Sequence, residues 1–407
     1  MATKKEWTVL YLAQIKNATD SRYFKLFLKE ITEVKLSSKI EVIFCINFKL
    51  KYVPPLIKDS LQNQIADKDK FTTLILKLTP NGTNNNGFSL IKEIPDFDIT
   101  CPEDIGMHFI RLTKSQYIAK KYLLSTWDHG NGYSIFEGSR ETKGVSLTMR
   151  GLNQAIKIGL GDKKKMDLLI MNNCWMQILD TPYALQNSVN YLVAPQDEVC
   201  LDFFDYKNIF RILGESPNIS AHNLSSAAVH SVREEFECAI KDFSVSAMDL
   251  AEVDSFFKTL NSLAIGLKQE MNINTGQGDV NQDFIDKVGY HFIKARRLDT
   301  GNRYIDLYSL LNTLLKVLPS KEARLCQSLI DGYKKLVIAF QTNYNNNSQD
   351  EWHRPYGISL YCPYSLPSSR EAMMMPRIFQ PKISRHIKDT DFKQTDWGKL
   401  MTDIDDL

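Results

Sequence analysis

The chain has 407 residues, of which 43% are hydrophobic and 24% are charged. These values are typical of a globular protein with a large core, and they exclude a disordered chain, a collagen-like chain and a coiled coil. The 50 basic and 48 acidic residues leave a net charge of +2, so no overall basic field predicts nucleic acid or a membrane surface as a partner.

The N-terminal stretch MATKKEWTVLYLAQ (1–14) does not have the pattern of a secretory signal peptide. Its apolar run is short, and no small-residue cleavage site precedes the polar stretch at 15–20. We therefore expect a first strand here. No apolar run approaches the roughly 18 residues that a membrane-spanning helix needs. We therefore expect a protein that is cytoplasmic, exported by a non-standard route, or secreted after removal of a leader.

The first half of the chain alternates strand-like and helix-like stretches. Several strand-like stretches are almost continuously apolar, as in strands that are buried on both faces. This alternation predicts an α/β sandwich with a mostly parallel sheet, whose chemistry lies at the carboxyl ends of the strands. The expected strands are 7–13, 40–48, 71–78, 121–127, 166–171 and 189–194, and the expected helices are 23–35, 102–119, 147–160 and 181–187, the last with Thr181 as its N-cap and Pro182 as its first residue.

The second half changes to a mainly helical pattern. The asparagine-rich tract at 343–351 predicts a loop, and GISLYCP (357–363) predicts a further buried strand that ends at Pro363. From residue 364 onwards we expect little regular structure. The expected helices are 223–240, 249–270, 279–296, 304–317 and 321–342, with a strand candidate at 243–248 among them.

Two of the expected strands lead directly into residues with reactive side chains. The strand at 121–127 is followed by His129 and Gly130, and the strand at 166–171 is followed by Cys174. In a right-handed parallel β-α-β unit these two strand ends are neighbours. A thiol nucleophile needs a proton-transfer partner within reach and backbone donors for the oxyanion, and glycine permits the close approach. A structural cysteine and a solvated histidine are the alternative.

The chain contains seven cysteines, an odd number, and they include no CxxC pair and no zinc-type Cys/His spacing. A disulfide scaffold is not expected at this chain length. Cys174 stands out because it alone lies at a strand end beside a matching His-Gly turn. The others are expected in core strands (Cys45, Cys362) or without a chemical partner (Cys101, Cys200, Cys238, Cys326).

These stretches, in this order, resemble the clostripain family of cysteine peptidases, which shares a clan and a caspase-like fold with caspases, legumain and gingipains. The family pattern has a strand ending WDHGSG, a strand ending near Asp-Ala-Cys-Leu-Met, a YLVASEE strand, an SAIDL segment and a late GLSIYFP strand. The resemblance covers most of residues 6–363. The matching stretches here are WDHGNG (127–132), DLLIMNNCWM (167–176), NYLVAPQDE (190–198), FSVSAMDLAEVDSFF (243–257) and GISLYCP (357–363).

The resemblance implies a caspase-like α/β/α sandwich with a mostly parallel six-strand core sheet and a mainly helical C-terminal elaboration. We expect a catalytic core at 1–215 and a mainly helical region packed on it at 216–345. The last part, 346–407, would contribute the late strand that completes the fold, followed by an irregular tail.

The resemblance also implies roles for single residues. His129 would be the general base or acid of a Cys/His dyad, and Cys174 would be the nucleophile that forms the acyl-enzyme. The backbone N–H groups of Gly130 and Cys174 would form the oxyanion hole. Asp128 is placed to orient the histidine, but its family counterpart is not catalytic, so we do not include it.

The expected S1 pocket departs from the family pattern at one position. The family has an aspartate two residues before the nucleophile, where it helps to bind Arg or Lys at P1, and this chain has Asn172. Asparagine cannot supply the charge-assisted bond that a carboxylate gives to a guanidinium. Alignment through YLVA places Asp202 at the second acidic position. Cleavage after Arg or Lys remains our expectation; another P1 preference, or a simple turn role for Asn172, are the alternatives.

Two further expectations follow from the resemblance. Members often mature by cleavage of the loop that here spans 137–146, where Lys143-Gly144 is the first candidate bond, Arg140 is the second, and a solvated basic loop is the alternative. No cofactor is required. Some relatives use Ca²⁺, for which acidic residues of one loop are candidates, although no EF-hand spacing exists and a plain acidic loop is the alternative. These acidic residues are Asp197, Glu198, Asp202 and Asp205.

The sequence therefore predicts a monomeric cysteine endopeptidase that acts on proteins or peptides, without a nucleic-acid or membrane partner and without a metal site. The alternative is a catalytically altered interaction or regulatory protein with a caspase-like fold. Asn172 and the divergent stretch at 13–23 favour this alternative, whereas the intact His129 and Cys174 count against it. A generic α/β hydrolase or a nucleotide-binding domain is not supported, because GxSxG and a Gly-rich phosphate loop are both missing.

Overall fold

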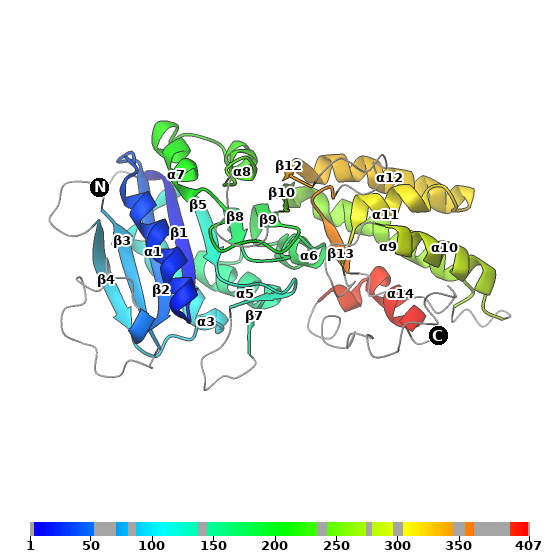
Figure 1. The fold of residues 1–407 in the computed structure, drawn as a ribbon, viewed down its shortest axis with the longest axis horizontal. Coiled ribbons are helices and arrows are strands. Elements are labelled where there is room, and N and C mark those ends of the chain that lie inside the picture. Colours follow the sequence, from blue (N-terminus) through cyan, green and yellow to red (C-terminus); the bar gives the residue numbers. More distant parts are fainter. Residues whose placement is uncertain are drawn as a thin grey trace.

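A nine-stranded sheet organises the described part of the chain (Figure 1). The computed structural model describes residues 4–52, 71–79, 87–136, 145–233, 242–273, 279–295, 304–344, 355–361 and 391–405. β9, β8, β5, β1 and β2 are parallel, and the outer strands are antiparallel to their neighbours. The order across the sheet is β12 (Val337–Thr342), β10 (Ser244–Asp249), β9 (Val189–Pro195), β8 (Met166–Asn172), β5 (Ala119–Trp127), β1 (Lys5–Ile15), β2 (Ile40–Lys49), β3 (Phe71–Leu78) and β4 (Phe88–Ile94).

Helices cover both faces of this sheet. One face is covered by α1 (Ala18–Thr32), α7 (Tyr206–Glu215) and α8 (Ala221–Val229). The other carries α3 (Pro102–Asp104), the π-helical η3 (Ile105–Arg111), α4 (Leu112–Gln116), α5 (Met149–Leu160) and α6 (Asp180–Leu185). Short 3₁₀ turns are η1 (Leu50–Tyr52), η5 (Leu250–Glu252) and η9 (Asp391–Gln394).

Both faces of the central strands are buried, which explains their continuous apolar runs. In β1, Val9 and Tyr11 belong to the cluster on the α1 side, whereas Leu10 and Leu12 belong to the cluster on the α5 side. Successive side chains of a strand point to opposite faces, so a strand between two helical layers needs apolar residues at every position.

A helical region lies beyond the β12 edge of the sheet, on the right of Figure 1. It consists of α9 (Val253–Glu270), α10 (Gln282–Lys294), α11 (Leu307–Leu314), α12 (Ser320–Leu336) and α14 (Asp396–Asp405), with a small sheet of β11 (Tyr304–Asp306) and β13 (Ser359–Tyr361). A second small sheet, β6 (Ser134–Ile135) with β7 (Leu147–Thr148), lies beside the central strands.

Buried hydrogen bonds join the helical region to the central sheet. The Gln196 side chain, just past β9, donates to the Asp306 carboxylate (2.9 Å) and accepts from the Ser244 hydroxyl (2.7 Å) and the Gly357 N–H (2.8 Å). Asp306 also accepts the Tyr356 N–H (2.7 Å). Buried polar groups that lose their partners are costly, so this network resists separation of the two regions.

The sheet contains all six strands that the sequence predicts, and it is larger than expected. Among these six strands, β3 runs antiparallel to the other five in the described sheet. β10 corresponds to the strand candidate at 243–248, whereas β4 and β12 are not expected from the sequence. The helix expected at 321–342 is wrong at its end, because 337–342 pairs with β10 instead.

Other element boundaries also differ from expectation. α1 begins at Ala18 because the Asn17 side chain caps it. Residues 304–306 form β11 rather than the start of a helix, because they pair with β13. The Thr181 N-cap is wrong, since α6 begins at Asp180. α8 ends at Val229 rather than 240, the helical segment from 102 ends at Gln116, and α7 and α14 are not expected, so the tail is not wholly irregular.

The late strand lies outside the central sheet. β13 is buried and pairs with β11, and its Ser359 forms a bridge with Ile178 and a side-chain hydrogen bond to the Gln196 carbonyl (3.5 Å). The strand expected to complete the fold is thus present in a small separate sheet, and β12 occupies the edge of the large one.

Candidate active site

The carboxyl ends of β5 and β8 bring the expected histidine and cysteine to the same edge of the sheet. The two strands are parallel neighbours, and Trp127 pairs with Asn172 at their ends. His129 and Cys174 each lie two residues beyond this last pair. The sequence-based expectation of adjacent strand ends is thus confirmed by the register.

The side chain of Asn173 fixes the backbone of the histidine turn. It is buried, accepts the Thr126 hydroxyl hydrogen (2.6 Å), and donates to the carbonyl oxygens of Asp128 (2.9 Å) and His129 (3.2 Å). Sequence reasoning assigns Asn173 no role. Its position at a buried strand end is the feature of the sequence that could have indicated a role, since a buried amide must find hydrogen-bond partners nearby.

Gly130 lies directly against the backbone of Cys174. A Cβ atom at this position would lie 2.6 Å from the Cys174 carbonyl oxygen and 3.1 Å from its nitrogen. Only glycine permits this approach. The next turn residue, Gly132, has φ +92 and faces the Tyr304 ring, whose hydroxyl donates to the Asn131 carbonyl (3.0 Å). The helical region therefore helps to shape the histidine turn.

The Cys174 thiol is buried and bonded to the backbone of Val199. Its S–H donates to the Val199 carbonyl (3.4 Å), and its sulfur accepts the Val199 N–H (3.5 Å). Burial raises the pKa of the thiol to about 11, with a further rise from Glu198 and Asp197 and an opposing effect of the Val199 and Gly130 N–H groups. The thiol is protonated at neutral pH, so its attack requires transfer of its proton.

The His129 ring faces an aspartate that the sequence does not single out. Its Nε2 lies 3.8 Å from Oδ1 of Asp20 on α1, and its side chain is 58% exposed. The facing Asp20 carboxylate raises the pKa of His129, Asp128 adds to the rise, and burial and Lys16 oppose it. Within the described chain no hydrogen bond joins His129 to Cys174.

Asp128 is occupied by a different partner. It is buried, and its Oδ2 lies 3.2 Å from the Lys16 ammonium. Burial raises the pKa of this carboxyl to about 6, and Lys16 opposes the rise. Asp20 rather than Asp128 is therefore the carboxylate that faces the Nε2 atom of His129.

The two expected S1 residues, Asn172 and Asp202, both lie next to Leu201. Asn172 is buried, and its amide donates to the Leu201 carbonyl (2.7 Å), which also accepts the Trp127 indole N–H (2.8 Å). Among the described residues, no hydrogen bond reaches the Oδ1 atom of Asn172. Asp202 is the next residue after Leu201, and its charge helps to raise the pKa of Arg233.

Cys200, in the same loop, is disulfide-bonded. This corrects the expectation that it has no chemical partner. The other described cysteines, which are Cys45, Cys101, Cys174 and Cys326, are free, so its partner lies outside the described residues. The disulfide places a covalent tether next to Val199, the residue that contacts the Cys174 thiol.

The acidic residues proposed for Ca²⁺ have other tasks. Asp205 caps α7 by accepting the Asn208 N–H (3.0 Å), and Asp197 accepts the Glu198 N–H (2.8 Å) and the Tyr344 hydroxyl. In the described ranges, no three His, Cys, Asp or Glu side chains gather closely enough to hold a metal ion. Ca²⁺ binding at these residues stays a prediction from the resemblance.

Lys143, the first candidate for self-cleavage, lies outside the described residues, and so does Arg140. The described ends of their loop are placed beside the site, because Ile135 forms a bridge with Gly130 and pairs with Leu147.

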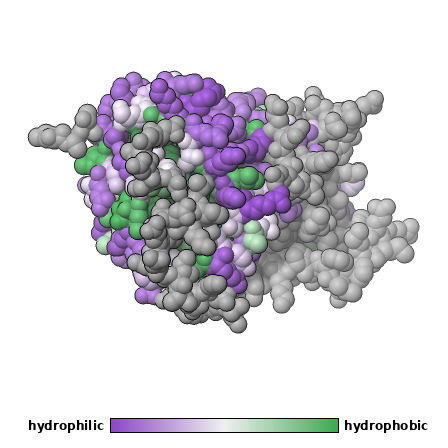
Figure 2. Space-filling view, turned by 60° about the vertical axis from the view of Figure 1, so that its left-hand side comes forward, coloured by the Kyte–Doolittle hydropathy of each residue, from purple (hydrophilic) through white to green (hydrophobic). Residues whose placement is uncertain are grey.

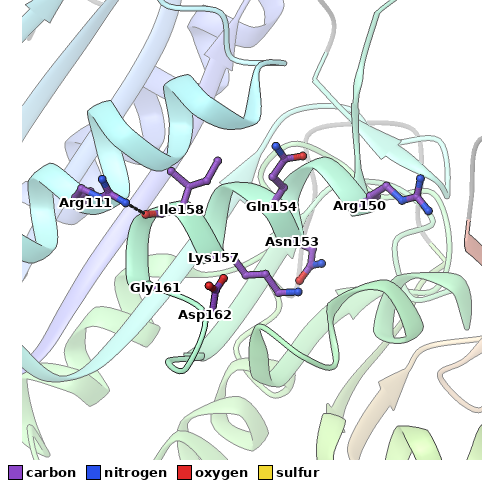
Figure 3. Close-up of a pocket in the computed structure, with 8 residues that line it drawn as sticks. All are labelled: Arg111, Arg150, Asn153, Gln154, Lys157, Ile158, Gly161 and Asp162. Carbon is purple, nitrogen blue, oxygen red and sulfur yellow. Dashed lines mark hydrogen bonds between the residues drawn. The ribbon is translucent and has the colours of Figure 1, made fainter.

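A pocket lies along α5, away from these residues (Figure 3). Figure 3 shows Arg111 bonded to the Ile158 carbonyl (2.6 Å), and Lys157 and Asp162 near the end of the helix. Neither His129 nor Cys174 lines this pocket. Its lining residues are Arg111, Arg150, Asn153, Gln154, Lys157, Ile158, Gly161 and Asp162.

On the face shown in Figure 2, the described residues are mainly hydrophilic. In the view of Figure 2, hydrophobic residues form separate patches between hydrophilic ones. Exposed large hydrophobic residues are spread over different elements, for example Leu26 on α1, Leu90 on β4 and Ile265 on α9. Among the helices that the structure describes, none is long and apolar enough to cross a bilayer.

Comparisons with known proteins agree on one family. The model of the C11 peptidases, the clostripain family, matches residues 92–379. No curated protein matches the chain.

Three similar solved structures are C11 proteases from Bacteroides thetaiotaomicron and Parabacteroides distasonis. A secreted C11 cysteine protease from Bacteroides thetaiotaomicron, "iotapain", is 14% identical, with a TM-score of 0.61 over 89% of this chain and 95% of that one. An inactive zymogen of a C11 protease from Parabacteroides distasonis is 13% identical, with a TM-score of 0.61 over 97% and 99%. A secreted C11 protease from B. thetaiotaomicron with an irreversible peptide inhibitor is 16% identical, with a TM-score of 0.59 over 99% and 100%. These likenesses confirm the expected fold class.

Proposed function

Because the chain belongs to the clostripain family of cysteine peptidases, we propose that His129 and Cys174 are its catalytic dyad. The observation that carries this proposal is the pairing of β5 with β8, which places both residues two positions beyond the same rung of the sheet. The close packing of Gly130 on the Cys174 backbone supports the proposal, because it brings together the two backbones whose N–H groups would bind the oxyanion.

In the proposed reaction, Cys174 sulfur attacks the carbonyl carbon of the scissile peptide bond. The backbone N–H groups of Gly130 and Cys174 bind the oxyanion. His129 gives a proton to the leaving amine, and the proton released from the Cys174 thiol restores the imidazolium. Water then attacks the thioester, which releases the acid product and returns the proton to the Cys174 sulfur.

We propose that Asp202 and Asn172 together recognise Arg or Lys at P1. Asn172 supports this assignment because its buried Oδ1 receives no hydrogen bond from a described residue and is available as an acceptor. Asp202 would supply the charge, one residue away from the Leu201 carbonyl that holds Asn172 in place. Arg233 lies near enough to interact with Asp202. The cationic side chain of the substrate would therefore share the Asp202 carboxylate with Arg233.

A panel of fluorogenic peptides with Arg, Lys, Asp, Asn or an apolar residue at P1 tests this assignment. We expect the highest kcat/KM for Arg and Lys. Asp202→Asn should lower kcat/KM for these two by about 10- to 100-fold, since a hydrogen bond to a charged group contributes about 1.5–3 kcal/mol.

Asp205→Asn is the matched control for the Asp202 variant. It makes the same change in the same loop, and asparagine caps a helix as well as aspartate does, so kcat/KM should remain at the wild-type value. An equal loss for every P1 residue in Asp202→Asn would contradict a role in specificity. No cleavage of any peptide would favour the alternative, a catalytically altered interaction protein.

We further propose that the enzyme cleaves its own chain after Lys143. The loop that carries this residue begins and ends beside the histidine turn, through the contacts of Ile135 with Gly130 and Leu147. A cut after residue 143 divides the 46.7-kDa chain by length into pieces of about 16 and 30 kDa.

A denaturing gel of purified wild type, Lys143→Ala and Arg140→Ala checks this cleavage. The two fragments should appear in wild type and in Arg140→Ala but not in Lys143→Ala. An intact wild-type chain would refute self-processing. Fragments that persist in Lys143→Ala and vanish in Arg140→Ala would move the cut to the second candidate.

A further inference from the structure

Asp20 lies behind the candidate dyad and has no part in the reaction described above. It occupies the first turn of α1, and its side chain is only 1% exposed. It belongs to a group of four charged side chains at this place, with Lys16, Asp128 and His129.

The two carboxylate oxygens of Asp20 have different surroundings. Oδ2 accepts the Lys16 backbone N–H (2.9 Å), and the Asp20 N–H donates to the Asn17 side chain (2.9 Å), so this side of the residue completes the cap of α1. Oδ1 is buried without a hydrogen bond and lies 3.8 Å from the Nε2 atom of His129. A buried carboxylate is costly unless a cation pairs with it.

His129 is the cation whose ring nitrogen faces Oδ1 of Asp20. The charged groups around the ring are Asp20 from α1, Asp128 from the histidine's own turn, and Lys16 between β1 and α1. Lys16 and Asp128 lie 3.2 Å apart and compensate each other. Despite its burial, Asp20 has a lowered pKa, because His129 and Lys16 favour its charged form.

We propose that Asp20 is a positioning residue of the peptidase reaction, which holds the His129 ring through Nε2 and keeps it protonated. The ring is thereby oriented with Nδ1 as the nitrogen left for the leaving amine of the substrate; no described residue hydrogen-bonds to Nδ1. This inference rests on the proposed role of His129. Asp20 acts through the histidine and does not touch the substrate.

The test is the titration of His129 by NMR in a Cys174→Ala background, which prevents self-cleavage. With Asp20 intact, the His129 pKa should lie above the unperturbed value of about 6.5. In Asp20→Asn it should fall by about one unit, the lower end of the effect of a neighbouring opposite charge. Asparagine retains an oxygen for the Lys16 N–H, so the cap of α1 is preserved.

The same change should alter the pH profile of the active enzyme. Since protonated His129 is the proton donor, the basic limb of kcat should move to lower pH by the same amount as the pKa. Well above the wild-type His129 pKa, kcat should fall by about 10-fold with little change in KM, which follows from the one-unit shift. Asp20→Glu, which keeps the charge, should restore the basic limb toward the wild-type position.

Asn17→Ala is the control for a purely structural role. It removes the side chain that caps α1 and should lower the melting temperature, but it leaves the charge at Asp20 and should not move the His129 pKa.

Three results would overturn the proposal. They are a His129 pKa at or below about 6.5 in the background protein, an unchanged pKa in Asp20→Asn, or an equal shift in Asn17→Ala. The first result comes from the protein with Asp20 intact, so it can refute the proposal even if the Asp20 variant does not fold. Full activity of His129→Ala would instead refute the dyad itself.

Discussion

Cys174→Ala should reduce peptide cleavage by at least about 10⁴-fold, because loss of the nucleophile removes the covalent step and leaves only binding and the oxyanion donors. The fold should be retained, since the change removes one sulfur atom from a site that the Val199 and Gly130 backbones surround. The measurements are kcat/KM on the peptide with the preferred P1 residue and labelling by an electrophilic peptide probe.

Cys101→Ala is the matched control for the nucleophile. Cys101 is also a free cysteine, and it is more exposed than Cys174. If exposure alone decided reactivity, Cys101 would be the labelled residue. We expect this variant to keep full activity and full labelling, and persistent activity of Cys174→Ala would refute the peptidase mechanism outright.

Gly130→Ala should reduce kcat by about 100-fold or more, the usual effect of losing one oxyanion donor. The new methyl group would lie 2.6 Å from the Cys174 carbonyl oxygen, and a backbone atom cannot move aside as a flexible side chain can. The histidine turn must therefore shift, and with it both the Gly130 N–H and His129. Activity and thermal melting of the purified variant measure the two effects separately.

Gly332→Ala provides the comparison for this glycine. Its new methyl group would lie 3.4 Å from the nearest atom, a carbon of Phe256, and alanine is favoured over glycine inside a helix. We expect unchanged activity and equal or higher stability. If Gly130→Ala also keeps wild-type kcat, the close approach at Gly130 has no catalytic meaning.

The helical region contributes to this same turn. Tyr304 faces Gly132 and binds the Asn131 carbonyl, and the Gln196–Asp306 pair connects the end of β9 to the start of α11. The packing of the second half of the chain therefore bears on the geometry of a site whose two reactive residues both come from the first half.

The sequence by itself determined the central strands, because their apolar runs follow from burial on both faces. It also singled out the residues proposed to carry the chemistry. His129 and Cys174 directly follow two such strands, and parallel neighbours end at the same edge. The role of glycine at position 130 could be predicted for the same reason, since the need for a close backbone approach in a turn is visible in the local sequence.

Only the tertiary structure decided the contacts between distant segments. Val337–Thr342 continues a helical pattern in sequence, but pairing with β10 makes it a strand. Asp20 looks like an ordinary residue of a helix start, and only the packing of α1 against the end of β5 brings it to His129. The Val199 backbone reaches the Cys174 thiol in the same way. Such contacts depend on register and helix packing, which no local pattern encodes.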